Sequence, residues 1–314
     1  MCKIPLLVIV GPTASGKTAL SVECACAFNG EIVSADSMQI YKGMSVATAK
    51  PTLCEMKGIR HHLIDFLDVS EKYSVADFTS DASRIIDEIY KNKKLPIVAG
   101  GTGLYVDSLV NNIKFTETET DFTLRAELTG ELERLGAEKM LENLSGFDPD
   151  TAKRLHPSDK KRIIRAFEVY KLTGKTMSQL EAESTATPSP YIPYFVGINF
   201  KDREKLYERI NKRVDLMLEN GLIKEAENYY NLPKRSTASQ AIGYKELKQY
   251  FDNELSLDEA VENLKKATRH YAKRQLTWFR RNRQIKWFYY DEYNSFDEFS
   301  FEVINYLKKV LNNV

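Results

Sequence analysis

Short, nearly continuous apolar runs alternate with amphipathic stretches over the first 115 residues. The runs are rich in β-branched residues and predict buried strands, and the stretches between them have apolar positions three or four residues apart, as in helices. Strands buried on both faces and separated by helices are typical of a parallel sheet. The predicted strands are Leu6–Val10, Glu31–Ala35, His62–Ile64 and Leu95–Ala99, and the clearest predicted helices are Ala19–Phe28 and Val75–Tyr90.

The pattern changes near residue 116. The acidic segment Thr116–Asp121 precedes a stretch in which apolar residues recur only at helical spacing, as far as about residue 183. Ser184–Pro193 then has the composition of a linker. We therefore predict an α/β core formed by residues 1–115 and 191–314, interrupted by a helical domain at 116–190. In the C-terminal part we predict strands at Tyr194–Phe200 and Ile285–Tyr290 and helices at Lys205–Asn220 and Leu257–Arg281.

The composition is that of a globular protein, with 43% hydrophobic and 28% charged residues. The apolar runs fall far short of the roughly 20 residues that a membrane-spanning helix needs, and the first one is too short for a signal peptide. The four cysteines form no C-x-x-C pair, which is typical of free thiols in a reducing compartment. We expect a cytoplasmic protein with no membrane segment, and a monomer.

Charge is distributed unevenly along the chain. The net charge of +1 combines −7 for residues 1–150, +11 for 151–290 and −3 for 291–314. On the predicted helix 257–281, an apolar face of Leu264, Ala267, Tyr271 and Trp278 has a basic flank, and no acidic residue occurs from 265 to 290. Such a helix suits docking to the core while facing phosphates, which position RNA without specifying its sequence.

Residues 11–18 read G-P-T-A-S-G-K-T and match the phosphate-loop pattern G-x-x-x-x-G-K-[ST] between a strand and a helix. Gly11 and Gly16 permit a tight turn in which successive N–H groups face one anion, at the positive end of a helix. Lys17 would reach the outer phosphate, and the Thr18 hydroxyl would bind Mg²⁺. The loop predicts binding of a di- or triphosphate group by Gly11, Pro12, Thr13, Ala14, Ser15, Gly16, Lys17 and Thr18.

Further polar groups follow the predicted strands. Asp36 and Asp65 each end a strand, and Thr102 lies in the turn Gly100–Gly103 after another. Open parallel sheets bind ligands at the carboxyl ends of their strands. Asp36 could hold a metal, act as a general base or cap the next helix, and Gly100–Gly103 could be a plain strand-to-helix turn.

Together these motifs resemble the tRNA dimethylallyltransferase family. The similarity covers most of the chain: 11–18, D-S-M-Q-I-Y at 36–41, H-H at 61–62, Y-S-V-A-D-F at 73–78, G-G-T-G-L-Y at 100–105, H-P-S-D at 156–159, R-I-I-R-A at 162–166, I-G-Y-K-E-L at 242–247, and 268–278. It implies a P-loop NTPase-like core with an inserted helical domain that grips the tRNA anticodon stem-loop. It implies transfer of a dimethylallyl group from dimethylallyl diphosphate to N6 of adenosine 37, beside the anticodon, with Mg²⁺ and release of diphosphate. The family acts on tRNAs that read codons beginning with U.

The resemblance also implies roles for individual residues. Asp36 matches the general base for the exocyclic amine, Thr102 a residue near the bridging oxygen of the diphosphate, and Arg213 an arginine that helps the leaving diphosphate. Thr18 and Asp36 would hold Mg²⁺. Without the resemblance, Arg213 would be a helix-surface arginine paired with Asp215 or Glu219. The implied tRNA contacts are Asp36, Ser37, Met38, Gln39, Thr102, Arg125, Lys160, Lys161, Arg162, Ile163, Ile164, Arg269 and Lys273.

Other functions fit parts of the pattern. A small-molecule P-loop kinase would use Asp36 for a metal or hydroxyl, although the turn 100–103 lacks the carboxylate expected of one. An adenylate isopentenyltransferase, which prenylates free adenine nucleotides, would not need the basic insertion and helix. A regulatory nucleotide-binding protein explains neither Asp36 nor Thr102. His156, within the insertion, could be a capping or packing residue. No Cys/His tail resembles the zinc finger of eukaryotic members, which suggests a bacterial-type enzyme.

Overall fold

The computed structural model describes residues 3–113, 121–184, 187–232 and 241–311. The chain divides into two compact units, a core unit of Met1–Val110 with Pro190–Val314 and a helical unit of Asn111–Ser189. The sequence pattern placed the insertion at 116–190. Most of the acidic segment 116–121, and part of the linker expected at 184–193, lie outside the described residues.

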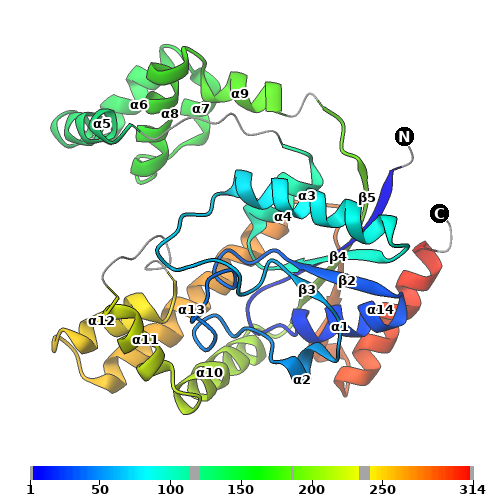
Figure 1. The fold of residues 1–314 in the computed structure, drawn as a ribbon. Coiled ribbons are helices and arrows are strands. Elements are labelled where there is room, and N and C mark those ends of the chain that lie inside the picture. The colour runs from blue at the N-terminus through cyan, green and yellow to red at the C-terminus, as the bar shows by residue number, and fades with distance from the viewer. Residues whose placement is uncertain (1–2, 114–120, 185–186, 233–240, 312–314) are drawn as a thin grey trace. The chain divides into compact units, whose positions relative to one another are not determined.

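Six parallel strands form the sheet of the core unit, in the order β3-β2-β4-β1-β5-β6 (Figure 1). The predicted α/β architecture with a parallel sheet is therefore confirmed. The register pairs Val10 with Gly100 and Ser34 with Ala99, so β1, β4 and β2 end side by side. The strands are β1 (Ile4–Val10), β2 (Gly30–Ser34), β3 (His61–His62), β4 (Leu95–Gly100), β5 (Tyr191–Asn199) and β6 (Lys286–Tyr289).

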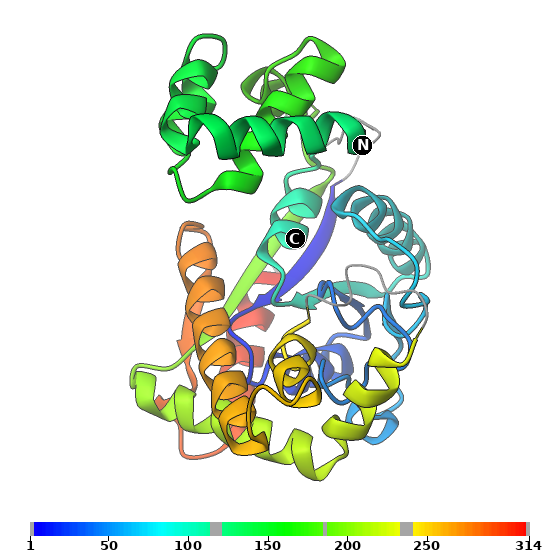
Figure 2. The same ribbon diagram turned by 90° about the vertical axis from the view of Figure 1, so that its left-hand side faces the viewer.

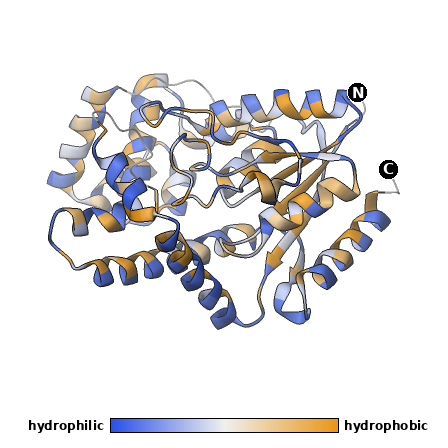
Figure 3. Ribbon diagram, turned by 60° about the horizontal axis from the view of Figure 1, so that its bottom comes forward, coloured by the Kyte–Doolittle hydropathy of each residue, from blue (hydrophilic) through white to orange (hydrophobic). Residues whose placement is uncertain are grey.

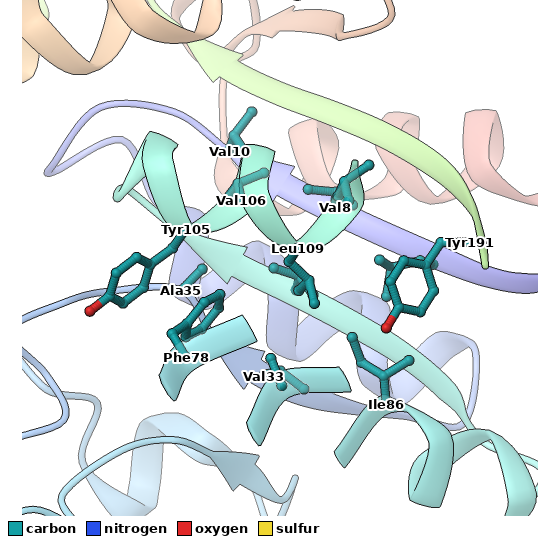
Figure 4. Packing of buried hydrophobic residues seen from close by; sticks show 14 of the residues in the cluster. Val8, Val10, Val33, Ala35, Phe78, Ile86, Tyr105, Val106, Leu109 and Tyr191 are labelled. Atoms are coloured by element: carbon teal, nitrogen blue, oxygen red, sulfur yellow. The ribbon is translucent and has the colours of Figure 1, made fainter. Parts of the chain in front are cut away.

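Helices cover both faces of the sheet because the central strands β2, β4, β1 and β5 carry buried apolar side chains on both sides. On one face, Phe78 of α3 stacks on Tyr105 of α4 with ring centroids 4.2 Å apart, above Val33 and Ala35 (Figure 4). The other face packs against α1 and α14. Hydropathy colouring shows the strands mainly apolar and α3 two-sided (Figure 3). These helices are α1 (Lys17–Ala27), α3 (Val75–Lys91), α4 (Gly103–Val110) and α14 (Phe296–Leu311).

A separate helical layer of the core unit packs around the segment that follows β2. Ile40 and Met44 are buried against Val214 of α10 and Leu264 of α13. Helices α10 and α13 lie side by side (Figure 2), joined by a bond from Arg269 Nη1 to Asn211 Oδ1 at 2.7 Å. The remaining elements of the core unit are α2 (Leu53–Met56), α10 (Arg203–Glu219), α11 (Leu222–Tyr230), α12 (Tyr244–Phe251), α13 (Leu257–Phe279) and a short 3₁₀ turn, η2 (Tyr290–Glu292).

The helical unit has a small core of its own. Leu128 and Leu132 of α5 and Ile163 and Phe167 of α8 are buried together, as their helical spacing predicts. Among the described residues of this unit there is no strand. Within the described parts of the whole chain, no helix combines the length and apolarity needed to cross a bilayer. The helices are α5 (Phe122–Leu135), α6 (Ala137–Ser145), α7 (Pro149–Arg154), α8 (Lys160–Thr173) and α9 (Met177–Ser184).

Two predicted boundaries are wrong. The strand expected at His62–Ile64 is His61–His62, because Leu63 takes a left-handed conformation (φ 58°), which ends the extended backbone. The expected linker ends at residue 190 rather than 193, because Tyr191 to Pro193 already pair with β1. Pro193 carries no N–H, but it still takes a register position opposite Leu6.

Candidate active site

The loop Gly11–Thr18 turns sharply from β1 into α1. Gly16 has φ 97° and precedes the first helical residue, so the turn needs a residue that tolerates positive φ. A Cβ at Gly11 would lie 2.6 Å from the carbonyl oxygen of Ile198 on β5. Both glycines of the motif are therefore required by the backbone. The first N–H groups of α1 have no acceptor within the helix and make this end suitable for an anion.

Two half-buried cations, Lys17 and Arg213, lie beside this loop. Lys17 Nζ donates to the carbonyl oxygen of Pro12 at 2.7 Å, and burial together with the neighbouring Arg213 lowers the pKa of Lys17 to about 7. Asp36 opposes part of that shift. Arg213 Nε is buried and has no hydrogen-bond partner among the described residues, and burial lowers its pKa as well. A site that holds two poorly compensated cations favours a multiply charged anion.

The pKa of Lys17 predicts proton uptake on anion binding. Above about pH 7 the ammonium is partly deprotonated, and a bound pyrophosphate would restore its charge. At about pH 8, calorimetry in buffers of different ionisation enthalpy should therefore show net proton uptake with inorganic pyrophosphate. The Lys17→Met variant is the control, because any proton uptake that it shows comes from pyrophosphate itself. Equal proton uptake by the wild type and the variant would contradict the prediction.

Two adjoining cavities lie at the carboxyl ends of the strands. One, of about 70 Å³, is called the loop cavity because Lys17 and Thr18 line it; Ser34, Gln39 and His61 are among its other lining residues. The other, of about 220 Å³, is called the apolar cavity. Both are lined in part by Thr13, Asp36, Arg213 and Tyr271. The apolar cavity is otherwise lined mainly by Met38, Ala47, Ile210, Val214, Met217, Ala241, Ile242 and Leu264.

Asp36 stands where the cavities meet. Its Oδ1 accepts hydrogen bonds from the N–H groups of Met38 at 2.9 Å and Gln39 at 3.3 Å. One carboxylate oxygen thus caps a turn, not the helix that the sequence allowed as an alternative. Asp65, the other candidate carboxylate, instead forms an ion pair with Lys50 and lines neither cavity. Asp36 is therefore the carboxylate that this edge of the sheet presents to a ligand.

Thr102 is held against the same turn. The N–H of Ser37 donates to Thr102 Oγ1 at 3.0 Å, and the N–H of Thr102 donates to the carbonyl oxygen of Ala35 at 3.1 Å. The segments that follow β2 and β4 are thereby joined directly. Gly100–Gly103 is thus more than a plain connection, since it carries the hydroxyl that contacts the Asp36 turn.

Helix α10 contributes two arginines to the loop. Arg209 Nε donates to the carbonyl oxygen of Ala14 at 3.0 Å, and Ala14 has a left-handed conformation with φ 61°. Arg213, one turn further on, lines both cavities. The alternative pairing of Arg213 with Asp215 is not observed, because Asp215 forms its ion pair with Lys265 at 2.8 Å.

The IPP transferase family model matches residues 39–282. The chain belongs to the IPP transferase family. A tRNA dimethylallyltransferase of Thermoanaerobacter sp. (strain X514) is 47% identical over 312 residues, 98% of this chain and 99% of the relative. The resemblance seen in the sequence is confirmed.

Solved structures of family members are also similar. The full-length tRNA isopentenylpyrophosphate transferase of Bacillus halodurans has 43% identity and a TM-score of 0.75, covering 99% of this chain and 98% of that one. A eukaryotic dimethylallyltransferase, crystallised acting on tRNA, has 33% identity and a TM-score of 0.74, covering 88% of this chain and 70% of that one.

The predicted RNA contacts of the helical unit differ in their exposure to solvent. Lys160, Lys161 and Arg162 are exposed at the N-terminal turn of α8, where the helix dipole is positive. Ile163 is different: its side chain is fully buried in the core of the helical unit, which leaves only its backbone for the implied tRNA contact. Ile164 is also buried.

Two other residues of the helical unit lie in local networks. Arg125 donates to the buried Glu168 at 2.7 Å, and its side chain remains 43% exposed. His156 is exposed and bonds Ser158 Oγ at 2.8 Å in the turn before α8. The packing alternative for His156 therefore does not hold, and the histidine supports a local turn.

Some basic residues of α13 bond the neighbouring helix α10, and others are exposed to solvent. Lys265 and Arg269 bond Asp215 and Asn211 of α10, whereas Lys273 is exposed. The predicted apolar face is only partly right, because Ala267 and Trp278 are half-buried and Tyr271 lines the cavities. The buried face consists of Ala260, Leu264, Ala272, Gln275 and Phe279.

The sequence argument missed three residues that shape this site. Tyr271 lines both cavities, and burial raises its pKa, which keeps its hydroxyl protonated. Gln275 contacts the loop directly, and Arg209 holds Ala14. The contacts of these three residues arise only when α10 and α13 pack against the loop, so the sequence offered little indication of them. The one available indication was an uncharged glutamine within a run of basic residues.

Proposed function

We propose that this protein transfers the dimethylallyl group of dimethylallyl diphosphate to N6 of adenosine 37 in tRNAs that read codons beginning with U. The observation that carries the proposal is the pair of half-buried cations, Lys17 and Arg213, that faces Asp36 where a polar and an apolar cavity adjoin. Family membership supports it, since the Thermoanaerobacter relative is named tRNA dimethylallyltransferase.

In this reaction the residues that line the two cavities would have different roles. The bond between the allylic carbon and the bridging oxygen breaks, and its electron pair stays with the diphosphate in the loop cavity. Lys17, Arg213 and the loop N–H groups stabilise that developing charge, most effectively in a dry site. The amine nitrogen bonds the allylic carbon, and Asp36 accepts the N6 proton. Thr102, whose hydroxyl accepts from the N–H of Ser37, would lie beside the bridging oxygen.

The apolar cavity suits the prenyl group and the extruded base. Its walls of Met38, Ile210 and Leu264 offer apolar surface to a five-carbon chain, and it shares Asp36 and Arg213 with the loop cavity. The allylic carbon would then lie between the amine and the departing diphosphate. Chemistry on a base within RNA requires such extrusion.

The site residues fit a magnesium ion. Thr18 and Asp36 both line the loop cavity and offer the oxygen ligands that Mg²⁺ prefers. Within the described ranges, no cluster of three or more His, Cys, Asp or Glu side chains could hold a metal ion. Diphosphate oxygens and water would therefore complete the coordination. Bound Mg²⁺ would neutralise charge on the diphosphate.

The proposal includes the type of core and its setting. The loop between β1 and α1, at the edge of a parallel sheet, supports a P-loop NTPase-like core. Cys24, Cys26 and Cys54 are free thiols, as expected in the cytoplasm.

The helical unit and α13 would bind the anticodon stem-loop. We expect Lys160→Ala with Arg162→Ala to weaken tRNA binding and to reduce the slope of log K against log salt by about 1.5, since each lost phosphate contact removes roughly 0.7–0.9. Filter binding over a salt series measures both quantities. Arg84→Ala with Lys91→Ala, exposed residues of α3, removes the same charge as a control. An unchanged slope would exclude this turn as an RNA contact.

The test of function is mass analysis of anticodon-loop nucleosides. Unmodified tRNA incubated with dimethylallyl diphosphate and Mg²⁺ should gain one dimethylallyl group on adenosine 37 and release diphosphate. Parallel incubations replace tRNA with AMP, or replace the donor with ATP and small acceptors. Prenylation of AMP without tRNA would indicate an adenylate isopentenyltransferase, and ATP turnover at ordinary enzyme rates would indicate a kinase.

A further inference from the structure

The side chain of Gln275 connects the phosphate loop to the turn after β4. Its Oε1 accepts a hydrogen bond from the N–H of Thr13 at 2.8 Å, and its Nε2 donates to the carbonyl oxygen of Gly101 at 3.0 Å. Gln275 is only 5% exposed. Because one partner is a donor and the other an acceptor, only one orientation of the amide satisfies both bonds.

The glycine turn is shaped to receive α13. A Cβ at Gly101 would lie 2.1 Å from Gln275 Nε2, and a Cβ at Gly103 would lie 2.2 Å from the ring of Trp278. Trp278 Nε1 in turn donates to Asp107 of α4 at 2.7 Å. The absence of side chains at both positions therefore brings α13 against the turn that carries Thr102.

The same contact changes the role of Thr13. Its N–H is directed to Gln275 and is occupied by that bond, so it does not add to the group of N–H donors available to an anion. The rest of the loop is thereby fixed relative to Gly101, and Thr102 follows Gly101 directly. Gln275 thus links the loop to the segment that carries Thr102, beyond the point where the pairing of Val10 with Gly100 ends the two strands.

We propose that Gln275 is a positioning residue that holds the phosphate loop and the Thr102 turn at the spacing the diphosphate requires. The inference rests on the proposed function and deepens it by naming the residue that sets the geometry of the leaving-group site. Misplacement of reacting groups by about 1 Å lowers rates by about 100-fold. Loss of the amide should therefore affect diphosphate binding and the chemical step while leaving tRNA binding intact.

The experiment separates bridging from packing. Gln275→Met keeps the volume but removes both hydrogen bonds, and Gly101→Ala pushes the amide away while Gln275 remains. Each variant should bind inorganic pyrophosphate with Mg²⁺ about tenfold more weakly and lower kcat by about 100-fold, with little change in KM for tRNA. Gln284→Ala, an exposed glutamine just beyond α13, should match the wild type.

The double variant Gly101→Ala with Gln275→Ala decides between the two roles. In the double variant the methyl group added at position 101 has room, because the long side chain of Gln275 is gone. The next atom that this Cβ would meet is the carbonyl oxygen of Gly11, 4.0 Å away. If Gln275 bridges, the double variant stays as impaired as each single variant, because all three break the same link. Recovery of pyrophosphate affinity and kcat would overturn the proposal, as would a Gln275→Met variant with wild-type values.

The pyrophosphate measurement is independent of the reaction. If the wild type bound pyrophosphate but did not prenylate tRNA, the proposed function would fail while the affinities of the variants still tested Gln275. Thermal unfolding of each variant shows whether the fold is intact. Should Gln275→Met not fold, Gly101→Ala and the double variant give the same comparison.

Discussion

Asp36→Asn is expected to lower the rate of prenyl transfer by about 1,000-fold, within the range typical of losing a general base. Asparagine keeps a side-chain oxygen that accepts from the N–H groups of Met38 and Gln39, so the turn remains. It cannot accept the N6 proton at neutral pH. The measurement is the single-turnover rate at saturating donor and tRNA, alongside a tRNA dissociation constant that should change less than about twofold.

Asp68→Asn is the matched control. Asp68 also accepts a hydrogen bond from the N–H two residues further on, that of Ser70 at 2.9 Å, but it is exposed and lines neither cavity. Its substitution should leave the rate unchanged. If Asp36→Asn kept more than about a tenth of the wild-type rate, Asp36 would not be the base.

Arg213→Met is expected to have opposite effects on activity and on stability. The rate should fall by about 100- to 1,000-fold, because the guanidinium no longer stabilises the leaving diphosphate. The melting temperature without ligands should rise by a few degrees, because Arg213 Nε is buried without a partner in the described part of the chain, and methionine removes that charge. Single-turnover kinetics and calorimetry measure the two effects.

The control for Arg213 lies on the same helix. Arg203 begins α10, its side chain is 69% exposed, and it contacts only the exposed Glu204 and the ring of Tyr207 among the interactions described. Arg203→Met should leave both the rate and the melting temperature close to wild type. A melting temperature that drops in Arg213→Met, with the rate retained, would identify a structural arginine instead.

The two neighbouring positive charges of Lys17 and Arg213 explain why Arg213→Met should lower the rate of prenyl transfer but raise the melting temperature. Burial lowers the pKa of both cations, Arg213 lowers the pKa of Lys17 further, and Asp36 offsets only part of these shifts. A diphosphate would supply the missing negative charge. Ligand binding should therefore stabilise the wild type more than Arg213→Met, as expected when binding is linked to folding.

Local sequence pattern predicted most of the fold correctly. Strand β1 and helix α3 follow directly from a continuous apolar run and from helical spacing. The error at β3 came from Leu63, whose left-handed backbone no propensity would suggest for a branched apolar residue. The segment was apolar enough for a strand, but its conformation depends on the turn that joins Asp65 to the carbonyl oxygen of Gln39.

Side-chain partners were harder to predict than elements. The acid-free stretch of α13 predicted that the basic flank of the helix faces phosphates, yet Lys265 and Arg269 in that flank bond α10. Their partners lie more than 40 residues earlier in the chain, and the helix rotation that brings them together comes from packing. Ile163 shows the same limit, because its place in a basic motif did not reveal that its side chain points into the core.

By itself, the sequence determined the phosphate loop and the sheet edge that receives Asp36 and Thr102, because parallel strands necessarily bring their carboxyl ends together. Only the tertiary structure decided which side chains complete the site. Thr13 and Gln275 are 262 residues apart, and their contact exists because α13 packs against a turn without side chains. Backbone periodicity is a local property, whereas a hydrogen bond within 3 Å depends on how distant elements pack.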